Sequence, residues 1–477
     1  MDERNLILPG NPRYQPKEMK GFFGYDYLYF GLAQVEIATL ETLGEIGVIP
    51  AEEMKTLGLK LKEKLLAIPT SQVDKIERKI THHDVRAWVR KAQEIINNDL
   101  ARWVHIPLTS YDPLDTGRII QFHSAYQKVL KPSLKETVSL LADLVEKFAS
   151  QVQIGRTHGQ HALPITVGFW LATILQRILY NWKQMEVYSE GLVGKISGAV
   201  GAYNAQVGLQ LEQRCGSKTF EDRVLEKLGL SPAKISTQIL LPEPLAYFLF
   251  SCVITSASFG QLGRDCRHLM RTEIAEVMES FEKDQVGSST MAHKRNPINF
   301  ENIEGMWLKT KNEFGKVLDT LISEHQRDLV GSCVARDYPI ILVNLQQQLN
   351  TLTRKNKQGI PFLSRISVDP KACQRNFDTS SNLILSEPLY IALQMAGYQG
   401  DAHELVNRTL VPEAKRTNLP LITVLEKLAG KDVYLGETLN KIPEEIQKLF
   451  RHPENYIGKA KEKAKEIAFS ARQQINS

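Results

Sequence analysis

The stretch that decides the fold class reads LKETVSLLADLVEKF and runs from Leu134 to Phe148. Its apolar residues recur at alternating spacings of four and three, through Val138, Leu141 and Val145. This spacing places them along one face of a helix, so the stretch predicts a long amphipathic helix.

The same helical pattern stands before this stretch, over residues 33–43 and 122–129, and after it, over 171–185. Gly47 stands where the first of these helices would end. No run of alternating apolar and polar residues stands out, and no hairpin dipeptide lies between strand-like segments. We therefore expect an all-α fold.

Composition excludes several classes of protein. Of the 477 residues, 43% are hydrophobic and 24% charged, as in a soluble globular chain of about three domains. The net charge of +5 is too weak to indicate nucleic acid binding. The first residues are too charged for a signal peptide, no stretch approaches 18 uncharged apolar residues, and the five cysteines form no CxxC pair. These features predict a cytoplasmic protein with reduced thiols, without a membrane span, disulfide or zinc site.

Irregular segments concentrate the residues that can do chemistry, and the richest is GSSTMAHKRNP, from Gly287 to Pro297. It combines hydroxyls, a glycine, cations and an amide, a set of groups that suits carboxylates and phosphates. A serine there can act as a base or nucleophile if its proton is lost to the surroundings. The alternative is a solvated basic loop.

A second segment, GRTHGQHALP over 155–164, places His158 and His161 three residues apart. On a helix they would share one face, as metal ligands, or one of them would be an acid or base. Spacing places no third ligand, so we expect no metal, and no nucleotide-binding glycine motif predicts another cofactor.

Three further groups are open to two interpretations. The blocks THHD at 81–84 and TSYD at 109–112 are either substrate contacts or helix caps. Arg327 and Arg336, with Ser332 between them, either clamp a phosphate or form surface ion pairs.

In their order along the chain, these segments resemble the fumarate-releasing lyase superfamily, whose signature is GSSxMPxKxNP, and within it the adenylosuccinate lyase family. The matching blocks are RYQPKEM at 13–19, THHDV at 81–85, LTS at 108–110, GRTHGQ at 155–160, GKISGAVG at 194–201, TQ at 237–238, the signature loop, EN at 301–302, RD at 327–328 and HPENYIG at 452–458. Ala292 replaces the proline usual in the signature, which should make the loop less rigid.

The resemblance implies cleavage of adenylosuccinate to AMP and fumarate by general acid–base β-elimination in purine biosynthesis, and cleavage of the succinylated aminoimidazole carboxamide ribotide. Ser288 would be the general base, His158 the general acid, and Glu301 the residue that orients this histidine. His83 would lie near the reacting centre. The implied substrate-binding residues are Arg13, Tyr14, His82, Asp84, His105, Thr109, Ser110, Thr157, Gln238, Ser289, Met291, Lys294, Asn296, Arg327, Ser332 and Arg336.

The same resemblance implies three helical domains: a small one over 1–111, a long central bundle over 112–365 that carries the signature loop 284–300, and a small one over 366–477. The bundles would form a homotetramer whose active sites are each built from three subunits, acting on a small nucleotide without metal or cofactor. One alternative is a related lyase for another succinyl-amine or a nitrosuccinate. An alternative of another class is a helical oligomer that serves as a non-catalytic scaffold.

Overall fold

The computed structural model describes residues 12–280, 290–291 and 293–476, and contacts divide the chain into two compact units. Unit 1 comprises Met1–Lys135, Tyr180–Gly260 and Ile303–Thr351, and unit 2 comprises Glu136–Leu179, Gln261–Asn302 and Leu352–Ser477. The division into domains 1–111, 112–365 and 366–477 stays a prediction.

The structure is 67% helical, which confirms the expected all-α class. The chain passes from one unit to the other within long helices, which are α8 (Lys131–Lys147), α9 (Val167–Glu190), α12 (Glu243–Leu269), α13 (Ile298–Asp319) and α15 (Pro339–Thr353). The helix predicted from the apolar spacing over 134–148 is α8.

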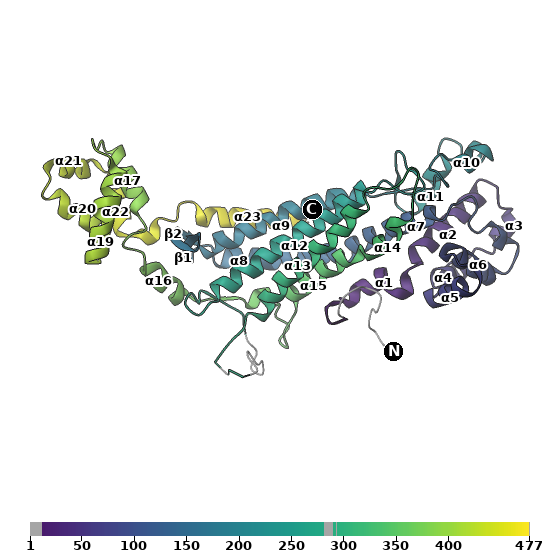
Figure 1. Ribbon diagram of the computed structural model, residues 1–477, viewed down its shortest axis with the longest axis horizontal. Coiled ribbons are helices and arrows are strands. Elements are labelled where there is room, and N and C mark those ends of the chain that lie inside the picture. The colour runs from purple at the N-terminus through teal and green to yellow at the C-terminus, as the bar shows by residue number, and fades with distance from the viewer. Residues whose placement is uncertain (1–11, 281–289, 292, 477) are drawn as a thin grey trace. The chain divides into compact units, whose positions relative to one another are not determined.

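Unit 1 contains further helices and one pair of strands. They are α1 (Lys20–Phe23), α2 (Phe30–Glu45), α3 (Ala51–Met54), α4 (Leu59–Leu66), α5 (Thr70–Ile76), α6 (Asp84–Ile96), α7 (Tyr111–Ala125), α10 (Asn204–Gly208), α11 (Phe220–Lys227) and α14 (Val330–Val334), with the short parallel pair β3 (Val193–Gly194) and β4 (Ser231–Pro232). Figure 1 shows α2 to α6 gathered in one group, whose core is formed by Leu32, Leu40, Trp88 and Val89 among others.

The helices α2 and α7 approach each other closely at a pair of glycines. A Cβ atom on Gly31 would lie 2.3 Å from the carbonyl oxygen of Gly117, and one on Gly117 would lie 2.6 Å from the carbonyl carbon of Gly31. Only glycine fits this crossing at both positions. The contact fixes α7, whose first turn carries Tyr111. Pro113 lies in the same turn, where a missing N–H costs no helical hydrogen bond, so it does not interrupt the helix.

Unit 2 contains further helices toward the C-terminus of the chain. They are α16 (Pro370–Asp378), α17 (Ser386–Met395), α18 (Ala402–Leu405), α19 (Val411–Thr417), α20 (Leu421–Ala429), α21 (Val433–Lys441), α22 (Glu444–Arg451) and α23 (Ala460–Asn476), with the antiparallel pair β5 (Val277–Met278) and β6 (Ser367–Val368). Figure 1 shows α17 and α19 to α22 as one cluster, and Leu389, Leu393, Leu410 and Leu425 belong to its core.

Unit 2 also contains a β-hairpin that the sequence pattern did not predict. Strands β1 (Val152–Thr157) and β2 (Gln160–Thr166) pair antiparallel, with Thr157 opposite Gln160. The turn is His158-Gly159, with positive φ angles of 54° and 75°, as a two-residue hairpin turn requires. The expectation of no hairpin is therefore wrong. The interpretation of His158 and His161 as neighbours on a helical face is wrong as well, because His158 lies in the turn and His161 in β2.

The expectation that no stretch is long and apolar enough to span a membrane is also wrong in one place. Helix α12 passes that test by length and composition, with a mean hydropathy of 1.5 over its most apolar window. That window is 61% buried inside the protein, and it includes the buried polar side chains of Ser251, Thr255 and Ser256. A buried helix of this kind is typical of the core of a soluble bundle.

Candidate active site

Residues that are far apart in the sequence meet in a polar pocket of unit 1. The pocket has a volume of about 470 Å³, within the range of small-molecule sites. Its lining residues are Glu77, His82, His83, Asp84, Ser110, Tyr111, Leu114, Gln238, Arg327, Asp328, Leu329, Ser332 and Arg336. Eight of the predicted site residues are among them, namely His82, His83, Asp84, Ser110, Gln238, Arg327, Ser332 and Arg336. We call this cavity the polar pocket.

The start of α6 supplies one wall of the polar pocket. His82 has a positive φ of 49° and ends the preceding helical turn. His83 caps α6, because its Nδ1 atom accepts a hydrogen bond from the backbone N–H of Arg86 over 3.4 Å. Its Nε2 atom lies 3.5 Å from the hydroxyl of Ser110. The helix-cap interpretation is thus correct for His83, and the same residue also lines the pocket.

The start of α7 supplies a second wall. Asp112 is fully buried, and its Oδ2 atom accepts the backbone N–H of Thr109 over 2.8 Å. Its Oδ1 atom accepts from the buried ammonium of Lys195 and from the backbone N–H groups of Ser197 and Gly198. Asp112 therefore fixes the Thr109–Ser110 turn against the loop that follows β3.

Two arginines approach the pocket differently. Arg327 donates from Nη1 to Oε1 of Gln238 over 2.6 Å, and its guanidinium carbon lies 3.5 Å from the ring centre of Tyr111. Arg336 forms an ion pair with Asp84, with 3.0 Å between Nη2 and Oδ2. Arg336 is thus ion-paired and also lines the polar pocket, so both interpretations of this residue stay open. Among the described residues, no carboxylate oxygen lies within ion-pairing distance of Arg327.

Neighbouring carboxylates shape the local charge. Backbone N–H groups of Glu324 and Val330 hold the pKa of Asp328 below its usual value. Burial raises the pKa of Asp115, although Arg118 nearby opposes that shift. Asp328 is therefore an anion that fixes the turn before α14 and is not a proton donor in the pocket.

His105 lies outside the lining of the polar pocket. Its Nδ1 atom is 2.7 Å from Oε1 of Glu36, and its backbone N–H donates to Oε2 of the same buried carboxylate over 2.9 Å. Burial lowers the pKa of His105, but the hydrogen bond and the charge of Glu36 outweigh it, so the net shift is upward. His105 is held by Glu36 in this structure.

The first predicted substrate contacts are also outside this lining. Arg13 is exposed, and Tyr14 is half-buried with its ring 5.6 Å from the ammonium of Lys309 on α13. Burial lowers the pKa of Lys309. The predicted contacts of Arg13 and Tyr14 with substrate stay predictions.

The predicted acid–base residues belong to unit 2. His158 and Thr157 are exposed at the tip of the β1–β2 hairpin. Met291, Lys294 and Glu301 are exposed and Asn296 is half-buried, in the segment that leads into α13 and in its first turn. Ser288 and Ser289 lie outside the described residues. Within the described part of the chain, no hydrogen bond joins His158 to Glu301, so that contact stays a prediction.

A buried carboxylate anchors the hairpin that carries His158. Glu276 accepts hydrogen bonds from Gln153 over 2.7 Å, from both terminal nitrogens of Arg156 over 3.0 and 2.7 Å, and from Asn376 over 2.8 Å. On β2, Nδ1 of His161 lies 2.8 Å from the hydroxyl of Ser380. Burial and Arg156 lower the pKa of His161, so it is a neutral structural partner of Ser380.

Sequence reasoning missed three residues that organise these sites, namely Tyr111, Lys195 and Glu276. Lys195 carried a signal, because it is the one charged residue in the matching block at 194–201, but its burial against Asp112 depends on tertiary structure. Tyr111 lies inside the TSYD block, but nothing in the sequence distinguishes it from the other residues of that block as a site residue. Glu276 lies in no matching block and gave no signal.

No group of three or more histidine, cysteine or acidic side chains that could hold a metal ion occurs in the described part of the chain.

Comparison with known proteins defines the class of protein to which the chain belongs. The profile of a family described as Lyase matches residues 31–310. Two solved structures share the fold, each with a TM-score of 0.78. One is a 3-carboxy-cis,cis-muconate lactonizing enzyme from Pseudomonas putida, which is 22% identical, with 97% of this chain and 98% of that chain covered. The other is a fumarate lyase from Mesorhizobium sp. BNC1, which is 20% identical, with 96% of this chain and 98% of that chain covered. The fold and the family match thus define a lyase.

Full-length relatives narrow this class. An adenylosuccinate lyase from Pyrococcus horikoshii is 34% identical, with 97% of both chains covered. Adenylosuccinate lyases from Archaeoglobus fulgidus and Staphylococcus saprophyticus are 31% and 30% identical, covering 97% and 93% of this chain and 98% and 96% of theirs. The chain belongs to the adenylosuccinate lyase family.

Proposed function

We propose that the chain cleaves adenylosuccinate into AMP and fumarate, and that it also cleaves the succinylated aminoimidazole carboxamide ribotide. The observation that carries the proposal is the polar pocket, in which Arg327, Arg336, Ser332 and Gln238 converge. Two guanidinium groups with neutral donors between them suit the phosphate and polar edges of a nucleotide. The adenylosuccinate lyases named above match this chain over nearly their whole length.

In the proposed reaction, Ser288 takes the proton from the β-carbon of the succinyl group. The electron pair left on carbon forms the double bond of fumarate, the carbon–nitrogen bond breaks, and the departing nitrogen takes its proton from His158. Lys294 and Asn296 bind the succinyl carboxylates and stabilise the negative charge that builds up before the bond breaks. The proposal also includes substrate contacts made by His83, Thr109, Ser110, Ser289 and Met291.

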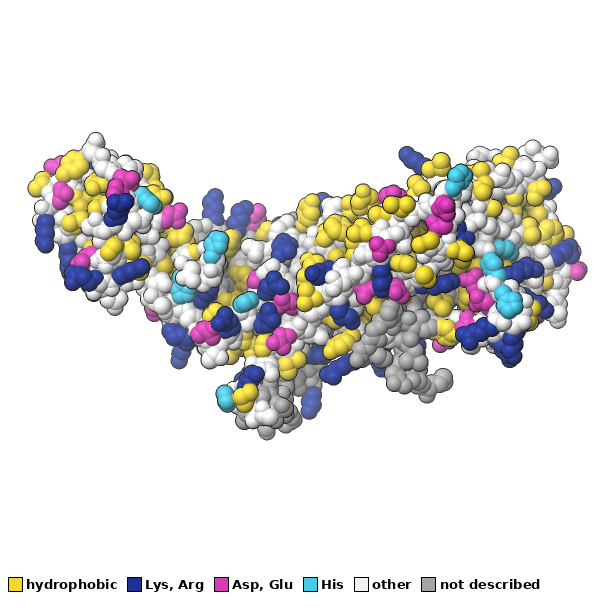
Figure 2. Space-filling view, viewed as in Figure 1, with side chains coloured by type: hydrophobic (Ala, Val, Ile, Leu, Met, Phe, Trp, Pro, Cys, Tyr) yellow, Lys and Arg dark blue, Asp and Glu magenta, His cyan; other side chains and the backbone are white. Residues whose placement is uncertain are grey.

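The same proposal includes a homotetramer with active sites shared between subunits. Exposed apolar side chains on the long helices of unit 1 support self-association: Tyr180, Val187, Tyr247, Phe250, Leu308 and Leu318. Figure 2 shows apolar side chains among charged ones on the visible face. Glu301 would then orient a histidine of another subunit, since within the described chain it makes no hydrogen bond with His158.

We further propose that the enzyme works in the cytoplasm on a small nucleotide, without a cofactor, a nucleic acid or a membrane. Free cysteines support a reducing compartment: Cys215, Cys252, Cys266 and Cys373 are buried and Cys333 is exposed. Burial raises the pKa of the Cys215 and Cys373 thiols, the latter to about 12, so these two are structural and unreactive.

The experiment that tests the reaction follows the loss of succinyl-purine absorbance when purified protein is added to adenylosuccinate. We expect turnover with release of fumarate. Turnover of another succinyl-amine or a nitrosuccinate, without turnover of adenylosuccinate, would support the related lyase instead. Absence of turnover with every such substrate would support the scaffold.

A second experiment tests the shared site. Ser288→Ala and His158→Ala should each nearly abolish turnover and leave the oligomer intact. Because a mixed oligomer contains sites that take a normal Ser288 and a normal His158 from different subunits, mixing the two inactive proteins should restore part of the activity. No restoration after subunit exchange would contradict the shared site.

A further inference from the structure

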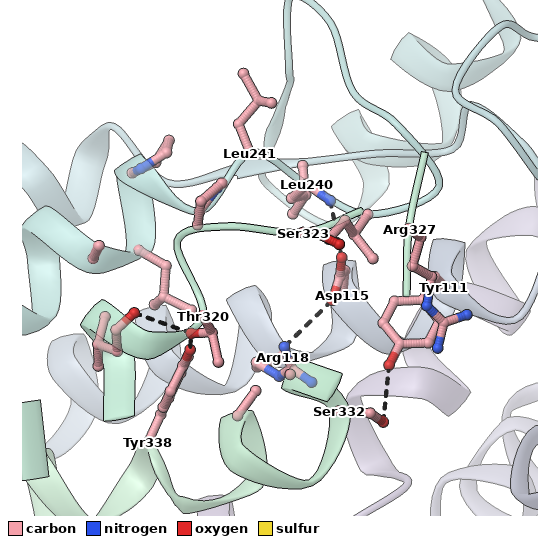
Figure 3. A pocket seen from close by; sticks show the side chains of 18 of the residues that line it. Tyr111, Asp115, Arg118, Leu240, Leu241, Thr320, Ser323, Arg327, Ser332 and Tyr338 are labelled. Carbon is pink, nitrogen blue, oxygen red and sulfur yellow. Dashed lines mark hydrogen bonds and ion pairs between the residues drawn. The ribbon is translucent and has the colours of Figure 1, made fainter. Parts of the chain in front are cut away.

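Tyr111, which begins α7, lies between two cavities of unit 1. Its side chain lines the polar pocket, and it also lines an apolar cavity of about 110 Å³ with Ile239, Leu240, Val317 and Tyr338. Figure 3 shows this apolar cavity, with the Tyr111 ring beside Arg327 and its hydroxyl directed to Ser332. Tyr111 is 9% exposed, so its ring is held firmly by its surroundings.

The ring of Tyr111 holds Arg327 without neutralising it. The guanidinium carbon lies 3.5 Å from the ring centre, and a guanidinium stacked on an aromatic face keeps its N–H donors in its own plane. Among the described residues, the hydrogen bond to Gln238 is the only one that Arg327 donates. A carboxylate partner would instead cancel the charge and occupy two donors.

The hydroxyl of Tyr111 prepares Ser332 in a complementary way. It donates to the Ser332 hydroxyl oxygen over 3.1 Å. A serine hydroxyl that accepts one hydrogen bond still has its own proton to donate. One tyrosine therefore orients a guanidinium and a hydroxyl toward the same pocket, and both remain able to donate to an anion.

We infer that Tyr111 is a positioning residue for the phosphate end of the substrate, acting through Arg327 and Ser332. This inference rests on the proposed function, in which the polar pocket takes a nucleotide monophosphate. Tyr111 fixes two phosphate donors before substrate arrives, so it lowers KM for phosphorylated substrates and leaves the chemical step unchanged.

The test compares Tyr111→Phe, which removes the hydroxyl, and Tyr111→Leu, which removes the ring. Tyr338→Phe is the matched control, because Tyr338 lines the apolar cavity and not the polar pocket, and its hydroxyl contacts Thr320. Each variant is assayed with adenylosuccinate and with succinyladenosine, the same substrate without its phosphate. Binding of AMP and of adenosine is measured by titration calorimetry.

For Tyr111→Phe we expect KM for adenylosuccinate to rise about 3- to 10-fold, with kcat within about two-fold of the unaltered protein. Tyr111→Leu should raise KM about 10- to 100-fold. With succinyladenosine, both variants and the unaltered protein should give similar kcat/KM. AMP binding should weaken by the same factors as KM rises, adenosine binding should not change, and Tyr338→Phe should behave normally throughout.

The inference is overturned if Tyr111→Phe and Tyr111→Leu lose activity equally on both substrates, lose only kcat, or lose nothing. The calorimetry separates this inference from the proposed function. One outcome is that the unaltered protein binds AMP but fails to cleave adenylosuccinate, while the Tyr111 variants lose affinity for AMP and not for adenosine. In that case the proposed reaction is wrong and the positioning role stands. If it cleaves adenylosuccinate and the variants show no preference between phosphorylated and unphosphorylated ligands, only the positioning role fails.

Discussion

The ammonium of Lys195 donates a hydrogen bond to the carboxylate of Asp112, and both side chains are completely buried. Asp112 also accepts the backbone N–H groups of Thr109, Ser197 and Gly198. The pair therefore joins the turn before α7 to the loop after β3. Because Thr109 precedes Ser110 and Tyr111, which line the polar pocket, this buried ion pair supports one wall of that pocket.

Replacing Lys195 with methionine should destabilise the protein strongly. The variant leaves the Asp112 charge buried without its cation, so we expect the free energy of unfolding to fall by about 3–5 kcal/mol. The double variant Lys195→Met/Asp112→Asn removes both charges and should recover part of this loss. Urea unfolding at fixed protein concentration measures the unaltered protein, the single variants Lys195→Met and Asp112→Asn, and the double variant.

Lys55→Met is the control for that experiment. Lys55 pairs with Glu52 on the surface, where the two side chains are 70% and 81% exposed, and we expect a change below about 1 kcal/mol. If Lys195→Met costs no more than Lys55→Met, or if the double variant is as unstable as the sum of its single changes, the pair does not hold this wall.

Replacing His158 with asparagine separates chemistry from folding. His158 occupies a left-handed position of the hairpin turn, and asparagine adopts that conformation readily. We therefore expect stability to change by less than about 0.5 kcal/mol while turnover falls about 10²- to 10⁴-fold, the usual loss when a general acid is removed. Steady-state kinetics and thermal unfolding measure the two effects.

The control for His158→Asn is His161→Asn, on the same hairpin. His161 contacts Ser380 and has no predicted role in proton transfer, so this variant should keep turnover within about ten-fold. Equal losses in the two variants would argue that the hairpin, and not the imidazole of His158, carries the effect.

The helical part of the fold was predictable because apolar spacing of three and four directly reflects burial of one helix face. The β1–β2 hairpin was not, since its strands VQIGRT and QHALPIT show no clear alternation of apolar and polar residues, and its turn depends on a histidine at positive φ. Propensity alone does not place a histidine there.

The polar pocket was predictable as a set of residues but not as an arrangement. Matching blocks brought His83, Ser110, Gln238 and Arg327 into one prediction, and the structure places them in one lining. The stacking of Arg327 on a tyrosine depends on how α7 and the segment before α14 meet in space. Sequence spacing carries no information on that meeting.

Replacing Glu276 with glutamine should loosen the hairpin that carries His158. The Glu276 carboxylate is fully buried and binds Arg156 through two nitrogens, together with Gln153 and Asn376. Glutamine has one acceptor oxygen and no charge, so we expect a loss of about 2–3 kcal/mol, faster amide exchange in β1 and β2, and a lower kcat. Hydrogen exchange and kinetics measure these changes.

Glu273→Gln is the control for the hairpin. Glu273 and its partner Arg271 are both 59% exposed, so this variant should change neither amide exchange in the hairpin nor kcat. Unchanged exchange in Glu276→Gln would show that the strands are held by their own pairing and not by the buried carboxylate.

The contact between His105 and Glu36 predicts a pH dependence of stability. Burial lowers the pKa of His105 and the Glu36 carboxylate raises it by more, so the folded pKa lies above the usual value of about 6.5. The folded protein then binds the proton more tightly than the unfolded chain does. This contribution to the free energy of unfolding is fully present below about pH 6.5 and is lost as the pH rises through the higher folded pKa.

We measure this contribution as the difference in unfolding free energy between the unaltered protein and His105→Gln, from about pH 5 to about pH 9. That difference should decrease with rising pH, and a constant or increasing difference would show that Glu36 does not hold a protonated His105.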